Sequence, residues 1–280
     1  MLLPRIFTAA ALVLLILASL AQTSLWPFAL LTLVLVAAAG WEWGRLNQVG
    51  GRVSVMFGLA VGAAGLATLS SSWGVHAPPG LWWTAVLLWA LGGSLALRSG
   101  PTAWPRLPRV ARCLLGLVGL WAAWLALANA QVLGINFLLS MLCLVWMADV
   151  AAYFGGRSFG RRKLAPTISP GKSWEGVWSG FAGVLLLALA WLAIDRQFEV
   201  DSHSLYTRLQ QGLGWGGMLL ALAWLSAFSV VGDLLESLVK RAAGAKDSSR
   251  LLPGHGGVLD RVDALLPVLP LALALTSLST

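Results

Sequence analysis

The chain has 280 residues, of which 58% are hydrophobic and only 11% are charged, and its formal net charge is +8. Soluble domains carry roughly a quarter charged residues, so this composition excludes a water-soluble globule and indicates an integral membrane protein. In such a protein the position of the basic residues matters more than their total, and we expect no nucleic-acid partner. Cys113 and Cys143 both fall within apolar runs, so neither indicates a disulfide or a metal site.

The apolar runs predict the transmembrane segments. A helix needs about 20 apolar residues to cross a hydrocarbon core about 30 Å thick. The candidate spans cover residues 4–21, 26–43, 54–71, 81–97, 109–128, 132–152, 174–194, 212–232 and 258–278. The first run has the basic start of a signal peptide, but another apolar run follows at once, which favours a retained helix. The sequence therefore predicts an all-α, polytopic membrane protein with about nine transmembrane helices.

The basic residues are distributed unevenly between the loops. If successive loops alternate sides, 17 of the 19 basic residues share the side of the N-terminus, and only Arg196 and Arg208 lie opposite. Lys-rich and Arg-rich loops stay in the cytoplasm during insertion. We therefore expect a cytoplasmic N-terminus, an outside C-terminus, and two cytoplasmic polar loops at 153–173 and 233–261.

Ionisable residues crowd into residues 226–266, between two apolar segments. Such groups beside or inside a bilayer mark a functional site by default. Asp260 and Asp263 stand three apart where a helix is expected to begin, so both carboxylates would project from one face. They either hold a hard cation such as Mg²⁺ between them or pair with Arg261, Arg250 or Lys246 as charges at a helix start. Spacing alone leaves both interpretations open.

Further acidic residues lie at the cytoplasmic ends of predicted spans. Asp233 and Glu236 end the eighth span, with Ser237 and Lys240 on the same helix face. The apolar residues around Asp233 favour a buried partner or a ligand over a solvated surface charge. Asp149 interrupts the inner end of the sixth span and either lines a site or hydrogen-bonds to a neighbouring helix.

A glycine-rich turn, PGHGG at 253–257, precedes the two aspartates. Exposed backbone N–H groups that lead into a helix N-terminus can cradle a phosphate, although glycines also form ordinary turns. His255 fits a phosphate contact, a proton-transfer role or a hydrogen-bonded turn.

The other polar loop contains PTISPGKS, which resembles a Walker A loop. Pro166 stands where that motif needs its first glycine and no strand precedes it, which excludes a P-loop. The loop ends in Ser169, Lys172, Ser173 and Glu175, which either hold a phosphate or belong to a basic connector.

Together the two polar segments resemble the phosphatidate cytidylyltransferase family, also called CDP-diacylglycerol synthases. The C-terminal signature of that family is matched position by position by SLVKRAAGAKDSSRLLPGHGGVLDRVD, from Ser237 to Asp263. The upstream ADVAAYFGGRSFGRRKLAPTISPGKSWEG also matches, except that Gly171 stands where many members have a basic residue. The specific resemblance covers residues 146–180 and 226–266, and elsewhere only the hydrophobic profile is similar.

The resemblance implies a Mg²⁺-dependent reaction in which the phosphate of phosphatidate attacks the α-phosphorus of CTP, giving CDP-diacylglycerol and pyrophosphate. It also implies a bacterial cytoplasmic (inner) membrane protein among membrane lipids, an active site that faces the cytoplasm, and a homodimer. The catalytic residues implied are Asp233, Lys240, Asp260 and Asp263. The implied ligands of one Mg²⁺, or of two cations, are Asp233, Asp260 and Asp263. The implied substrate-binding residues are Asp149, Ser169, Lys172, Ser237, Arg241, Lys246, Asp247, His255, Gly256 and Gly257.

We divide the chain into N-terminal scaffold helices, residues 1–130, and a catalytic transmembrane region, residues 131–280. Two alternative functions are weighed against a phosphatidate enzyme. A transporter would spread its acids over several helices near mid-bilayer, whereas here they gather at one face. The nearer alternative is the same chemistry on another lipid, by a polyprenol or ether-lipid cytidylyltransferase or a CTP-dependent lipid kinase.

Overall fold

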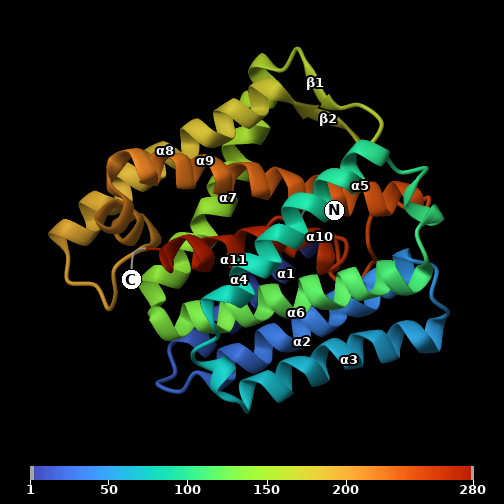
Figure 1. Ribbon diagram of the computed structural model, residues 1–280, viewed down its shortest axis with the longest axis horizontal. Helices are drawn as coiled ribbons and strands as arrows, with labels where there is room; N and C mark the ends of the chain where they lie inside the picture. The colour runs from blue at the N-terminus through green and yellow to red at the C-terminus, as the bar shows by residue number, and fades with distance from the viewer. Residues whose placement is uncertain (1–2, 279–280) are drawn as a thin grey trace.

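The computed structural model describes residues 3–278 and is dominated by long helices (Figure 1). In this described part, 7 helices are long and apolar enough to cross a membrane. They are α2 (Trp26–Leu46), α3 (Gly51–Leu69), the continuous stretch Pro79–Ser99, α6 (Arg109–Leu133), α7 (Ile135–Phe159), α8 (Trp174–Gln197) and α9 (Leu205–Ala242). The stretch Pro79–Ser99 is made of α4 (Pro79–Leu87), the π-helical turn η2 (Leu88–Gly93) and α5 (Ser94–Ser99). The helical, polytopic membrane fold predicted from the sequence is confirmed.

The first and last predicted spans differ from this pattern, so the count of nine is not confirmed. The first is helix α1 (Leu3–Leu20), in which the described apolar stretch covers only Ala10–Leu20. The last is broken into α10 (Leu259–Val262) and α11 (Leu265–Thr276). At 1.5 Å per residue, α11 is about 18 Å long, too short for a hydrocarbon core of about 30 Å.

Helix α11 is an internal element rather than a lipid-facing one. Every residue from Leu266 to Ala274 is buried, and the helix packs against α4, α6 and α9 in the middle of the molecule (Figure 1). The chain therefore enters its last helix from a polar turn that is itself enclosed by protein.

The two polar segments are more ordered than predicted. Helices α7 and α9 continue to Phe159 and Ala242, so the predicted loops 153–173 and 233–261 both begin as helix. Strands β1 (Lys163–Ala165) and β2 (Ser169–Ser173) pair as an antiparallel hairpin, at the top of Figure 1. The expectation that no strand precedes Pro166 is wrong, because β1 ends at Ala165; the Pro-Gly pair in β2 disfavours strands and hid the hairpin, and Pro166 alone still departs from the Walker A motif.

Connections on each predicted side of the membrane contact one another. At one end, Trp43 Nε1 donates to the carbonyl of Arg112 at 2.9 Å. At the opposite end, Asn129 Nδ2 donates to the carbonyl of Trp73 at 3.0 Å, and Thr276 lines a cavity with the connection between α3 and α4. The end of α2 thus lies beside the start of α6, and the ends of α6 and α11 lie beside the connection between α3 and α4, while the orientation in the membrane stays a prediction.

The outer surface of the helices is apolar. Large side chains such as Leu14, Val34, Leu59, Val110 and Leu220 are each at least 65% exposed. A water-facing surface rarely presents contiguous apolar patches of this kind, so we take this surface to face lipid.

Candidate active site

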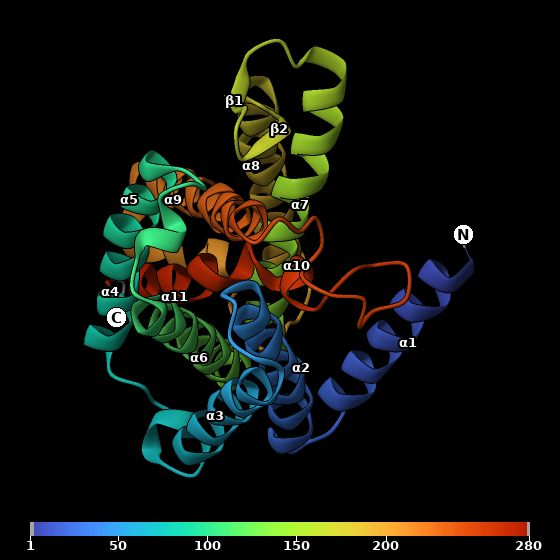
Figure 2. The ribbon, with the colours of Figure 1, turned by 90° about the vertical axis from the view of Figure 1, so that its right-hand side faces the viewer.

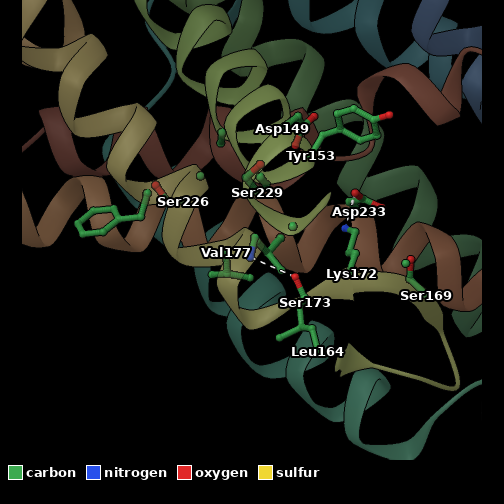
Figure 3. A pocket seen from close by; sticks show the side chains of 18 of the residues that line it. Asp149, Tyr153, Leu164, Ser169, Lys172, Ser173, Val177, Ser226, Ser229 and Asp233 are labelled. Atoms are coloured by element: carbon green, nitrogen blue, oxygen red, sulfur yellow. Dashed lines mark hydrogen bonds and ion pairs between the residues drawn. The ribbon is translucent and has the colours of Figure 1, made fainter. Parts of the chain in front are cut away.

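A cavity of about 510 Å³ lies where α7, α8 and α9 meet the β1–β2 hairpin (Figure 3). Its wall includes the predicted site residues Asp149 from α7, Ser169 and Lys172 from β2, and Asp233 from α9. Small residues of the three helices form much of the remaining lining. The fold thus brings four predicted site residues, distant in sequence, to one cavity.

The charged centre of this cavity is an ion pair. The ammonium of Lys172 reaches from β2 to the Asp233 carboxylate on α9 (Figure 3). Their side chains are 26% and 31% exposed, so the pair is only partly shielded from solvent. Ser237, one turn further along α9, lies 3.5 Å from Asp233 Oδ1 and donates to it, which confirms their expected shared helix face.

Asp263 belongs to the same charged group, although it follows α10 and lies outside the long helices. Burial, followed by the charges of Asp233 and Asp149, raises the pKa of Asp263 to about 8. The N–H of Ala264, 2.8 Å from Oδ1, and the charge of Lys172 offset this only in part. The raised pKa favours the neutral acid at Asp263, and a hard divalent cation bound beside it would favour the carboxylate instead.

Asp260 lies in a second cluster. It accepts hydrogen bonds from Lys240 Nζ at 2.7 Å, from the N–H of Ser248 at 3.0 Å and from the N–H of Gly257 at 2.7 Å. Lys240 also pairs with Glu236 at 2.6 Å. Burial opposes ionisation of Asp260, but hydrogen bonds with Glu236, Lys240 and Gly257 lower its pKa below the usual range.

The two aspartates that the sequence placed on one helix face are therefore separated. Helix α10 is only four residues long, and each carboxylate has found its own donors. The alternative, structural ion pairing at the helix start, also differs from what was expected. Asp260 pairs with Lys240 instead, and Arg261 donates to the carbonyl of His255 at 2.6 Å. The pairing seen for Asp260 therefore differs from the one expected, and the cation interpretation stays a prediction.

The donor set decides how well a cation fits. Across residues 3–278, no three His, Cys, Asp or Glu side chains lie together as a metal-holding group. Mg²⁺ is often bound by one or two carboxylates together with substrate phosphates. Asp233 and Asp263 fit that description better than Asp260, because the oxygens of Asp260 already accept hydrogen bonds from Lys240, Ser248 and Gly257. The predicted metal set stays a prediction.

The glycine-rich turn is held largely by protein acceptors. The N–H of Gly257 is bonded to Asp260 and that of His255 to the carbonyl of Leu252. Gly256 has a φ of +86°, in the left-handed region that favours glycine. Within the described residues, His255 Nδ1 is buried without a hydrogen-bond partner. The phosphate-binding roles predicted for this turn stay predictions.

Three other predicted residues lie near the hairpin or on the following loop. Arg241 Nε donates to the carbonyl of Ile168 at 3.4 Å and so joins the end of α9 to the hairpin. Lys246 and Asp247 are exposed on the loop that leaves α9. All three are placed where a soluble, charged substrate has access.

Sequence reasoning missed Glu42. It lies in α2, is 0% exposed, and accepts hydrogen bonds from Ser248, Ser249, Val258 and Leu259. The signal was available, because an ionisable residue inside an apolar span is a functional-site hypothesis by default. Helix α2 of the predicted scaffold thus contacts the predicted catalytic region directly, and the proposed division at residue 130 stays a prediction.

Residues 3–279 match the model of the cytidylyltransferase family. The chain belongs to the cytidylyltransferase family. It is similar to proteins named phosphatidate cytidylyltransferase: one from Pseudomonas aeruginosa is 39% identical over 257 residues, which cover 89% of this chain and 87% of the relative. Relatives of the same name from Haemophilus influenzae and Staphylococcus epidermidis are 47% and 38% identical over 137 and 159 residues. Those shorter matches cover 49% and 57% of this chain and 44% and 56% of the relatives. The resemblance inferred from the two polar segments is confirmed.

Proposed function

We infer that this chain is a phosphatidate cytidylyltransferase, a membrane enzyme that converts CTP and phosphatidate to CDP-diacylglycerol and pyrophosphate. One observation carries this conclusion: the family match runs along nearly the whole chain, and a relative of that name is matched over 87% of its length. The charged cavity among α7, α8 and α9 supports it, because both substrates are phosphates.

The reaction asks mainly for positioning and charge neutralisation. An oxygen of the lipid phosphate forms a bond to the α-phosphorus of CTP, and the bond from that phosphorus to the pyrophosphate oxygen breaks. A phosphate monoester is already ionised near neutral pH, so the nucleophile needs no strong general base. Preorganised cations aimed at the reacting phosphates are then expected to supply most of the acceleration.

Lys172 and Lys240 are the side chains that we assign to the phosphates. Lys172 lines the cavity and is paired with Asp233, so an entering phosphate competes with that carboxylate for the ammonium. Lys240 follows Asp233 by seven residues, which places both on one face of α9. The carboxylates of Glu236 and Asp260 hold its ammonium in place.

We propose that Asp233 and Asp263 hold Mg²⁺, with Asp149 close to them and Asp260 as the further predicted ligand. The position of Asp263 supports this assignment: it lies within range of the charges of Asp233, Asp149 and Lys172, and a cation there would replace the proton that burial favours on its carboxyl group. When bound, Mg²⁺ supplies neutralisation of phosphate charge. Ser169 and Ser237 contribute hydroxyl groups near the same centre.

We also propose that this site faces the cytoplasm of a bacterial inner membrane, and that the C-terminus lies outside. The concentration of 17 of the 19 basic residues on one side supports the orientation. The location suits the chemistry, because CTP is a cytoplasmic solute and phosphatidate is a membrane lipid. The homodimer implied by the resemblance stays an expectation.

A lipid panel tests the substrate. Purified protein in detergent is given labelled CTP with phosphatidate or with a polyprenyl phosphate, with and without Mg²⁺. We expect labelled CDP-diacylglycerol from phosphatidate only. Product from another lipid phosphate alone would retain the chemistry and change the substrate, and no product from any lipid with folded protein would contradict an enzyme of this class.

A further inference from the structure

Glu42 is a fully buried carboxylate in an otherwise apolar transmembrane helix. Among the ion pairs of the described residues, none includes it. It is satisfied instead by the N–H groups of Val258 and Leu259, at 3.0 and 2.7 Å, and by the hydroxyls of Ser248 and Ser249. A buried charge is retained at low cost only when it is hydrogen-bonded in this way.

All four of these donors come from one segment, Ser248–Leu259, which links α9 to α10. Helix α10 has no side-chain cap from its own sequence neighbourhood. The carboxylate of Glu42 takes that role from 216 positions away in the sequence, by accepting from Val258 and Leu259 at the start of the helix. The loop is thus fixed to a membrane-embedded helix rather than by local turns alone.

Ser248 connects this anchor to the site. Its hydroxyl lies 3.1 Å from Glu42 Oε2 and 2.9 Å from Asp260 Oδ2, and its N–H donates to Asp260 at 3.0 Å. Asp260 in turn holds Lys240 at 2.7 Å. A continuous line of hydrogen bonds therefore runs from α2 through the loop to the ammonium on α9.

Gly257 lies against these hydrogen-bonded groups, at a point where an added Cβ would not fit. A Cβ at Gly257 would overlap both Ser248 Oγ and Glu42 Oε1. The close approach of Ser248 and Glu42 to this turn therefore depends on the absence of a side chain at residue 257.

We propose that Glu42 is a positioning residue for nucleotidyl transfer: from α2 it holds the Ser248–Leu259 segment so that Asp260 keeps the ammonium of Lys240 in place. This inference rests on the proposed function. It gives helix α2 a part in the reaction although its carboxylate touches neither substrate.

The test is a double-mutant cycle between Glu42→Gln and Asp260→Asn, measured as kcat and KM with CTP and phosphatidate. We expect Glu42→Gln to lower kcat on the order of 10- to 100-fold, as loss of an outer-shell partner does at metal sites. Because Glu42 acts through Asp260, the double variant should be no slower than Asp260→Asn alone. If the two substitutions acted independently, their fold-losses in kcat would instead multiply.

Hydrogen exchange supplies a readout that does not depend on turnover. In Glu42→Gln the amides of Val258 and Leu259 should exchange faster, while those of α3 stay unchanged. Ser249→Ala, which leaves Glu42 three of its donors, should lower kcat only a few-fold. Glu199→Gln, in the exposed connection at the opposite face, is the matched control and should behave as the wild type.

The outcomes separate the two claims. If the wild type forms no product, the proposed function fails and the positioning role of Glu42 fails with it. If the wild type is active and Glu42→Gln has the same kcat, or the two substitutions multiply, the positioning role alone is overturned. Should Glu42→Gln not fold, Glu42→Asp, which keeps the charge but withdraws the carboxylate, takes its place in the same cycle with the same expectation.

Discussion

The ammonium of Lys172 is paired with the Asp233 carboxylate, and Asp149 and Asp263 lie within range of the same charges. Closely spaced carboxylates repel unless a cation or a proton intervenes. A divalent cation bound among these groups would replace a proton on Asp263, and as a ligand of the folded state it should act on folding as well as on catalysis.

Mg²⁺ is expected to raise the Tm of the purified protein, and Asp263→Asn should largely abolish that shift. A ligand that binds only the folded state adds about 2.7 kcal/mol of stability at 100 times its Kd. Thermal unfolding in detergent, with and without Mg²⁺, measures the effect. Glu199→Gln should retain the full shift, and an equal shift in Asp263→Asn would remove this residue from the proposed metal set.

Removal of Lys172 should weaken catalysis without loss of fold. Lys172→Ala deletes a charged contact to phosphate, and hydrogen bonds to charged groups contribute about 1.5–3 kcal/mol, so kcat/KM should fall roughly 10- to 150-fold. Steady-state kinetics measures this change. Lys163→Ala, which removes an exposed lysine from the other strand of the hairpin, is the control and should change kcat/KM little. Equal losses in both variants would point to the hairpin rather than to the ammonium.

At the scale of elements, α7 and α8 form one wall of the cavity because small residues let their backbones approach closely. A Cβ at Gly180 would lie 2.8 Å from the carbonyl oxygen of Ala148. Close approach through small residues is the usual way in which transmembrane helices pack. The width of the cavity between these helices and α9 therefore depends on that contact.

Gly180→Ala is expected to destabilise the protein by about 1–3 kcal/mol, because the opposing atom belongs to the backbone and cannot swing aside. Thermal unfolding measures the loss. Gly216→Ala in α9, where a Cβ meets nothing within 4 Å, should be neutral or slightly stabilising. A wild-type Tm for Gly180→Ala would show that the two helices can separate without penalty.

The long helices could be predicted from the sequence, because length and hydropathy are properties of a segment by itself. The hairpin could not be predicted, and the last span, 258–278, was expected as one transmembrane helix without the break and burial that α11 shows, since both features depend on neighbouring elements. Within the site, the signature residues were found, but the separation of Asp260 from Asp263 required knowledge of their partners. Glu42 could have been singled out as a charge inside an apolar span, but its hydrogen-bond partners could not be predicted, because they lie in a loop distant in the sequence.

At the scale of the whole molecule, two sets of connections lie at opposite ends of the helices. Figure 2 looks onto one end, where α1 leans away from the other helices and the loop before α10 reaches toward it. Thr8 of α1 donates to the carbonyl of Pro253 at 3.2 Å. The wall of the charged cavity includes Ser169, Lys172 and Ser173 of the hairpin, and among the described residues none of 198–204, the connection between α8 and α9, lines it.

Cysteine labelling in intact cells should reveal the orientation. In a background with Cys113→Ser and Cys143→Ser, a membrane-impermeant maleimide should label Glu199→Cys, which lies in the connection between α8 and α9. Lys163→Cys, in the hairpin, should be labelled only after the cells are broken, because basic loops stay in the cytoplasm. The reverse labelling pattern would show the opposite orientation in the membrane, in which the site would not face cytoplasmic CTP.

The most direct test of the central claim follows the α-phosphorus of CTP. Purified protein, phosphatidate and Mg²⁺ are incubated with CTP that is radiolabelled at either the α- or the γ-phosphorus, with Asp263→Asn in parallel. A phosphatidate cytidylyltransferase carries the α-label into CDP-diacylglycerol, leaves the γ-label in pyrophosphate, and does neither in the folded variant. Transfer of the γ-label to lipid would establish a kinase instead, and α-label transfer that is undiminished in Asp263→Asn would contradict the site described for this chain.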